Sequence, residues 1–178
     1  MESNTALLEN LSTTFSELAA AIQRFNDVSF NSKPAGGNWS PAMVAQHLIL
    51  AGTGIDKVLL GNTRPTATAS DEKVAQLKDI FLNFDHKMTS PEFIEPIDQH
   101  YSLEGQKDKL NDIGAGIMKI VPDLDLTLTC TDFEMPFLGY LTRLELITGG
   151  QKCLKVPQTE NKALSLFGLA IAFTKPWR

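Results

Sequence analysis

The sequence contains three histidines, the side chains that most often bind metal ions or transfer protons near neutral pH. His47 shares a predicted helix face with Val44 and Leu48, so its imidazole points into the protein. An inward imidazole is either a metal ligand or, more commonly, a core side chain hydrogen-bonded to a carbonyl or hydroxyl group. His86 and His100 are predicted at a helix end and in a loop, and we expect both at the surface.

Two cysteines, Cys130 and Cys153, are too few for a disulfide framework. Either thiol could be a nucleophile, but the sequence positions no base beside it, and we expect both to be small buried hydrophobic side chains. The sequence has no His-x-x-x-His pair, HExxH, CxxC or Gly-x-Ser-x-Gly motif, and its two Gly-Gly pairs lack the lysine of a phosphate loop. Short motifs therefore do not identify a reaction.

Amphipathic helices must position these side chains, because apolar residues recur at gaps of three and four along much of the chain. The first predicted helix places these apolar residues on one face: Leu7, Leu8, Leu11, Phe15, Leu18, Ile22 and Phe25. Residues 27–38 break the pattern and predict a loop. Ser40 as N-cap and Pro41 in the first turn then predict the start of the helix that carries His47, and Gly61-Asn62 predicts its end.

Two further helices precede an extended stretch. One is predicted to begin near Ser70 and to end before residues 89–91. The next is predicted to be capped by Ser102, to carry apolar residues from Leu103 to Ile120 and to end at Pro122. Residues 123–131 alternate apolar and polar side chains, which predicts an extended connection or at most a short hairpin.

The last conventional helix is predicted to begin near Leu141. Its Thr142, Arg143 and Glu145 side chains are expected to face solvent, and the glycines at 149–150 are expected to fray or stop it. Together these elements predict an all-α fold: a helix bundle with long crossover connections.

Length and composition indicate one domain over residues 1–178, with 43% hydrophobic and 21% charged residues. The net charge of −5 and the scattered basic residues argue against nucleic acid and against anionic membranes as partners. The N-terminus lacks the basic and apolar regions of a signal peptide, and the longest apolar run, residues 163–173, is too short to span a bilayer. We therefore expect a reduced, cytoplasmic protein.

Three stretches of the sequence, in this order, resemble the DinB-like superfamily. Residues 38–48 (NWSPAMVAQHL) are similar to the start of its second helix, where a tryptophan and a serine precede an inward histidine. Residues 90–96 (SPEFIEP) are similar to a loop in one branch of the superfamily, and residues 132–145 (DFEMPFLGYLTRLE) to the segment that leads into the last helix. The resemblance covers residues 1–148.

The resemblance implies a four-helix bundle in up-down-down-up order, often a homodimer. It also implies a divalent metal ion, zinc or nickel, held by one histidine on the second helix and two histidines four residues apart on the last. Residues at i and i+4 share a helix face, and a third ligand from a facing helix leaves positions open for water or substrate. Superfamily members include bacillithiol-dependent thiol transferases, mycothiol-dependent isomerases and metal-dependent hydrolases, in which the metal lowers the pKa of a bound thiol or water.

The sequence departs from this pattern at the paired histidines. Their positions, eight and twelve residues beyond Glu145, hold Cys153 and Pro157. A cysteine thiolate can bind zinc, but proline has no ligand atom in its side chain and interrupts the helix that would orient the pair. His47 with Cys153 therefore gives at most two metal ligands.

The resemblance is lost after Thr148. Residues 149–178 continue through the apolar stretch ALSLFGLAIAF, which predicts a short helix between residues 159 and 175. An abrupt loss of similarity is typical of a replaced C-terminus, for example after a change of coding frame, and the nucleotide sequence would test this hypothesis.

Two main hypotheses for the function remain open. In the first, the protein is a metal-dependent transferase or hydrolase acting on a small thiol or electrophile, with His47 and Cys153 as the remaining ligands of an impaired metal site. In the second, which the missing ligand pair favours, it is a non-catalytic helical bundle that binds a small ligand or a partner. Homodimer formation through a helix face is the simplest partner interaction, and no catalytic residue is assigned.

Overall fold

The computed structural model describes residues 4–35, 39–82 and 90–154. This part of the chain is mostly helical, which confirms the all-α prediction. Its helices are α1 (Asn4–Ile22), α2 (Asp27–Asn31), α3 (Pro41–Gly52), α4 (Ile55–Leu60), α5 (Val74–Leu82), α6 (Leu103–Ile120) and α7 (Arg143–Cys153). Single turns of 3-10 helix form η1 (Glu92–Ile94) and η2 (Val121–Asp123), and short strands form β1 (Thr63–Arg64) and β2 (Thr129–Cys130).

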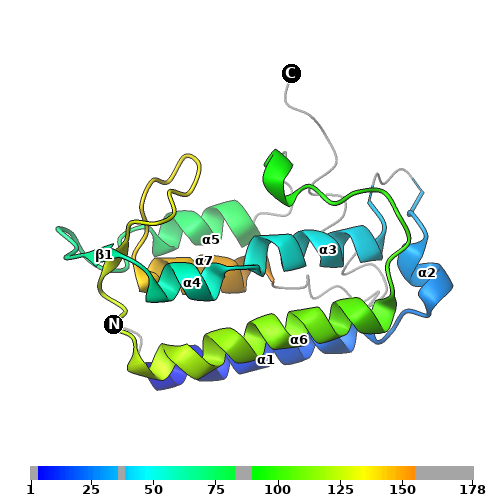
Figure 1. Ribbon diagram of the computed structural model, residues 1–178, viewed down its shortest axis with the longest axis horizontal. Helices are drawn as coiled ribbons and strands as arrows, with labels where there is room; N and C mark the ends of the chain where they lie inside the picture. Colours follow the sequence, from blue (N-terminus) through cyan, green and yellow to red (C-terminus); the bar gives the residue numbers. More distant parts are fainter. Residues whose placement is uncertain (1–3, 36–38, 83–89, 155–178) are drawn as a thin grey trace.

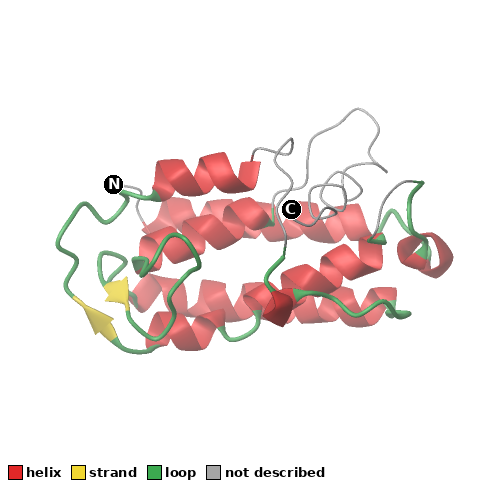
Figure 2. Cartoon of the chain, turned by 90° about the horizontal axis from the view of Figure 1, so that it is seen from above, coloured by secondary structure: helices red, strands yellow, loops and turns green. Residues whose placement is uncertain are grey.

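The longer helices lie side by side along the long axis of the molecule (Figure 1). α1 packs against α6, α6 also contacts α3 and α4, and α5 packs against α7. α1, α5 and α7 run in one direction along this axis, and α3, α4 and α6 run in the other (Figure 1). Figure 2, turned by 90°, shows the two short strands at one end of the helices.

Two predicted helix starts are confirmed by their caps. The Ser40 side chain accepts a hydrogen bond from the backbone N–H of Met43, and Pro41 lies in the first turn of α3. The Ser102 side chain accepts from the backbone N–H of Gly105 at the start of α6. Each hydroxyl satisfies one of the N–H groups that have no partner within a helix.

The helix that carries His47 is interrupted, whereas the sequence predicts one helix up to Gly61. α3 and α4 are separated by Thr53, which is extended, and by Gly54, which has a left-handed φ of 84°. Glycine adopts this conformation without the steric cost that a Cβ brings. The prediction missed this break because apolar spacing continues across it.

Two other segments correct the sequence prediction. α2 forms within the expected loop, because Asn26 and Ser29 make a reciprocal capping box between their side chains and backbone N–H groups. α7 continues through Gly149 and Gly150, where it was expected to fray or stop. Gly149 allows close packing with α5, since a Cβ there would lie 3.2 Å from a methyl carbon of Leu77.

The extended stretch at residues 123–131 contributes only β2 to a two-stranded antiparallel sheet. Thr63 of β1 lies opposite Cys130, and Arg64 lies opposite Thr129. The partner strand therefore comes from before α5 and not from an adjacent hairpin. The third predicted helix is α5, which begins at Val74. Its predicted end before residue 89 and the helix predicted between 159 and 175 lie outside the described residues.

The buried side chains form two clusters, and Ile113 and Leu154 pack against both. The larger one joins α1, α5, α7 and the end of α6, and includes Leu7, Leu11, Phe15, Leu77, Ile117, Val121, Leu144 and Ile147. The other joins the end of α1 to α2, α3 and the start of α6, and includes Leu18, Ile22, Phe30, Trp39, Val44, Leu48 and Leu110.

The stretch Pro41–Leu60 is long and apolar enough to cross a membrane, judged by length and composition alone. Most residues of α3 within it are buried in the second cluster. Core packing therefore accounts for the apolar composition of α3, whereas only Leu59 of α4 is buried.

Candidate functional site

His47 lies on the buried side of α3, next to η1. The residue is 2% exposed, which confirms the predicted inward direction. Its ring nitrogen Nδ1 lies 2.9 Å from the carbonyl oxygen of Ile94 and 3.4 Å from the hydroxyl oxygen of Ser90. The Trp39 ring stands beside the imidazole, with the centroids 5.3 Å apart. The imidazole therefore fastens the segment around η1 to α3.

The hydrogen bond to Ile94 determines which ring nitrogen of His47 carries the proton. A carbonyl oxygen can only accept, so Nδ1 donates the hydrogen, and Nε2 of the neutral ring carries the lone pair. Burial lowers the pKa of His47 below its ordinary value of 6.5, while the hydrogen bond to Ile94 opposes that shift. The imidazole is therefore neutral near pH 7.

The lowered pKa of His47 predicts a pH-dependent stability. The unfolded chain takes up the His47 proton near pH 6.5, whereas the folded chain does so only at lower pH. The free energy of unfolding should therefore be highest above pH 6.5 and should fall as the pH drops below that value. Urea unfolding at several pH values measures this slope. His47→Asn should reduce this slope, and an unchanged slope in His47→Asn would contradict the assignment.

The described residues do not supply the rest of a metal site. Among residues 4–35, 39–82 and 90–154, no three His, Cys, Asp or Glu side chains lie close enough to hold an ion. Cys153, the second predicted ligand, ends α7, and burial raises the pKa of its thiol to about 11. A zinc site needs at least three protein ligands, and no group of three donors is present in the described ranges. These donors therefore do not fit the zinc or nickel ion that the resemblance implies.

The structure separates the other predicted residues from His47. His100 is at the surface, as predicted, and its Nε2 lies 2.9 Å from a carboxylate oxygen of Asp27 on α2. Cys130 is completely buried in the larger cluster, as expected for a hydrophobic side chain, and burial raises the pKa of its thiol. His86 and Pro157 lie outside the described residues.

Glu145 is buried, which corrects the expectation that it faces solvent. The residue is 2% exposed, and Thr142 beside it is 3% exposed. One carboxylate oxygen accepts from the backbone N–H of Thr142 at 2.9 Å, and the other accepts from the backbone N–H of Lys73 at 2.7 Å. Glu145 therefore caps the start of α7 and also binds the residue that precedes α5.

A wider network of hydrogen bonds surrounds this carboxylate. The Thr142 hydroxyl donates to the carbonyl of Ser70, and the Lys73 ammonium group donates to the carbonyls of Leu138 and Tyr140. The spacing Thr-x-x-Glu at residues 142–145 is a capping-box motif. The sequence therefore indicates the contact between Glu145 and Thr142, but not the contact with Lys73. The network fixes residues 138–142 against the start of α5.

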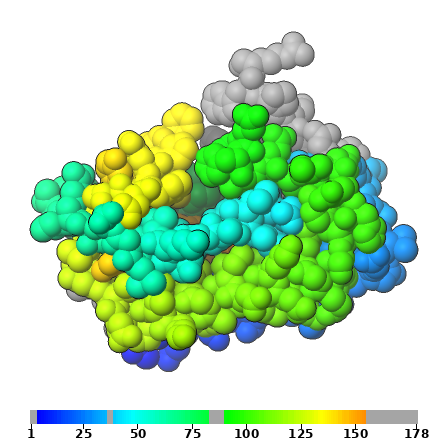
Figure 3. Space-filling view, in the orientation of Figure 1, coloured from blue at the N-terminus to red at the C-terminus, as the bar shows by residue number. Residues whose placement is uncertain are grey.

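Figure 3 shows a hollow in one face of the molecule. It is bordered by α3 and α4 in cyan and blue-green, by the yellow segment that leads into α7, and by the green segment around η1. His47 joins two of these borders, because it belongs to α3 and binds the carbonyl of Ile94 in η1.

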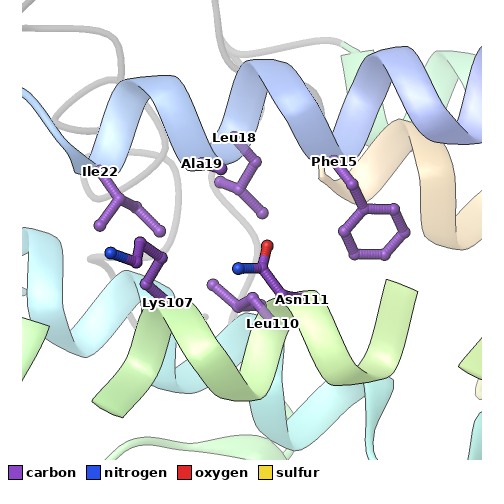
Figure 4. A pocket seen from close by; sticks show the side chains of 7 residues that line it. All are labelled: Phe15, Leu18, Ala19, Ile22, Lys107, Leu110 and Asn111. Atoms are coloured by element: carbon purple, nitrogen blue, oxygen red, sulfur yellow. The ribbon is translucent and has the colours of Figure 1, made fainter. Parts of the chain in front are cut away.

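A second, shallow crevice lies between α1 and α6 (Figure 4). It has about 170 Å³ of space, open to solvent, and is lined by Phe15, Leu18 and Ile22 from α1 and by Lys107, Leu110 and Asn111 from α6. Apolar side chains and one lysine stem line most of it, with no cluster of titratable groups. This crevice is therefore a gap in helix packing and not a reaction site.

Comparisons with family models, with curated proteins and with solved structures find no match to this chain. The DinB-like resemblance therefore depends on the three stretches of sequence alone.

Proposed function

We propose that the protein is a non-catalytic helical bundle of the DinB-like kind that binds a small organic ligand in the hollow, without a metal ion. The observation that carries this proposal is the hydrogen bond from His47 Nδ1 to the carbonyl of Ile94. This hydrogen bond gives His47 a structural role. It connects η1, which borders the hollow, to α3.

The directions of the helices support the four-helix part of this proposal. Taken in chain order, α1, the α3–α4 pair, α6 and α7 run up, down, down and up along the long axis (Figure 1). In this arrangement α5 is an additional helix that packs on α7. The crossover is the connection between α4 and α6, which run in the same direction, as expected for a bundle of this order.

The donor atoms weigh against the enzymatic alternative, a metal-dependent transferase or hydrolase acting on a small thiol or electrophile. Such a site needs three ligands and an open position on the metal. Among residues 4–35, 39–82 and 90–154, no three His, Cys, Asp or Glu side chains lie close enough together to supply these ligands. In the proposed function, His47 is a positioning residue and binds no metal.

Two substitutions of His47 separate these functions. In His47→Asn, the amide nitrogen Nδ2 takes the place of ring Nδ1 and can still donate to Ile94, but Nε2 is lost. His47→Ala loses both nitrogens. If His47 only holds η1 through its hydrogen bond to Ile94, His47→Asn should bind the ligand about as tightly as the unmodified protein. His47→Ala should bind it about tenfold more weakly, because one buried hydrogen bond contributes about that much. If His47 is a metal ligand, both variants lose the activity equally.

The measurement is a fragment screen by NMR on ¹⁵N-labelled protein in the presence of EDTA. We expect at least one small organic fragment to shift amide signals of residues 90–98 and 131–140, which border the hollow. His100→Ala, which changes an exposed histidine, should bind the fragment normally. Either binding that EDTA abolishes or a complete lack of fragment binding at these amides would contradict the proposed function.

A further inference from the structure

Phe137 is presented to solvent in a conformation that phenylalanine rarely adopts. Its side chain is fully exposed, and its φ is 66°, in the left-handed region that favours glycine. The turn around it is well formed, since Met135 and Gly139 exchange backbone hydrogen bonds at 3.0 and 2.9 Å. The Phe137 ring does not pack in the core, and its positive φ strains the backbone. Folding therefore does not explain this phenylalanine, which points to a role in binding.

Other exposed apolar side chains lie on the segment of Phe137 and on a second segment on the same side of the molecule. Among the described residues, the six large hydrophobic side chains that are exposed include Phe137 and Tyr140 on one segment and Phe93 and Ile97 on another. Figures 1 and 3 show these two segments, residues 131–140 and 90–98, rising on the same side of the molecule at the hollow. We call these two segments the apolar rim, because they carry four of the six exposed large hydrophobic side chains of the described residues.

The charge of the apolar rim indicates what covers it. Glu92, Glu95 and Glu134 are exposed on the same two segments, and none of them forms an ion pair with any of the described residues. A second copy of this chain would bring the same carboxylates together, and an anionic membrane would repel them. A partner with basic side chains complements this charge, and one with apolar side chains complements Phe137 and Phe93.

We propose that the apolar rim, residues 90–98 and 131–140, is a docking surface for a basic segment of another protein that also carries apolar side chains. Phe137 is the anchor that enters the partner, as exposed aromatic rings at the centre of an interface commonly do. The glutamates orient the partner and raise its rate of association. The apolar rim consists of the two segments that border the hollow, but this interaction is tested without a ligand in the hollow.

A phage-displayed library of random dodecapeptides, panned on the full-length protein, tests the proposal. We expect the selected peptides to share lysine or arginine with aromatic or aliphatic residues, and to bind less tightly as the NaCl concentration rises. Phe137→Gly should fold at least as well as the unmodified protein, because glycine adopts a positive φ without strain. We expect it to lose about tenfold or more in affinity for the selected peptides. Val28→Ser is the matched control, since Val28 is 79% exposed on α2, away from the rim.

Several results would overturn the proposal. They are selected peptides without basic residues, a failure to select any peptide, or equal binding by Phe137→Gly and the unmodified protein. Light scattering would reveal a dimer that Phe137→Gly dissociates, which would assign the rim to a second copy of this chain. Sedimentation with phosphatidylcholine vesicles, with and without phosphatidylserine, would reveal a membrane surface as the partner if Phe137 is required there.

Discussion

Replacing Glu145 with alanine is expected to lower the free energy of unfolding by about 3 to 5 kcal/mol. The carboxylate accepts hydrogen bonds from the backbone N–H groups of Thr142 and Lys73, at the starts of α7 and α5. Removing it leaves both donors without this partner in a buried place, and each unsatisfied donor costs about 1 to 3 kcal/mol. The two helix starts also lose the negative charge that favours the positive end of a helix dipole.

Urea unfolding of Glu145→Ala measures this loss. Glu17→Ala is the matched control, because Glu17 is exposed on α1 and its removal should change stability by less than about 0.5 kcal/mol. Glu145→Gln should fall between the two, since its amide keeps one acceptor but turns an NH₂ group towards a donor. Equal stability of Glu145→Ala and Glu17→Ala would contradict the double-capping role.

Replacing Gly114 with alanine is expected to destabilise the protein by about 1 to 3 kcal/mol, although alanine is the better helix former. Gly114 lies where α6 packs against α1, and a Cβ there would be 2.9 Å from two ring carbons of Phe15. The ring is 7% exposed and part of the larger core cluster, so it has little room to move. The two helices would have to separate to admit one methyl group.

Gly116→Ala is a matched control two residues away on the same helix. A Cβ at Gly116 meets nothing within 4 Å, so this substitution should stabilise the protein by about 0.5 to 1 kcal/mol through helix propensity alone. Phe15→Leu should reduce the cost of Gly114→Ala, which a double-mutant cycle measures as a coupling energy. Additive effects of the two changes would show that Phe15 is not the obstacle.

Local signals in the sequence predicted the elements that depend on neighbouring residues. Ser40-Pro41 and Ser102 marked the starts of α3 and α6, because a cap acts within one helical turn. The break at Gly54 and the continuation of α7 through Gly149 were missed. The first depends on one left-handed residue inside an apolar pattern, and the second on Leu77, which lies far away in the sequence.

The inward direction of His47 could be predicted from its helix face, but its partner could not. Ile94 lies 47 residues further along the chain and binds through a carbonyl group, which every residue has. Glu145 was wrongly expected at the surface because its second partner, the N–H of Lys73, lies 72 residues away. Spacing patterns record which face a side chain occupies, and they carry no information about distant backbone groups.

The ¹⁵N NMR signals of the His47 ring report directly on whether this imidazole is a tether or a metal ligand. In EDTA at pH 7.5, we predict a protonated Nδ1 that donates to Ile94 and an unprotonated Nε2. After the EDTA is removed by dialysis, addition of one equivalent of zinc should leave both signals unchanged. A shift of the Nε2 signal on addition of zinc, reversed by EDTA, would contradict the proposed function and show that His47 belongs to a metal centre.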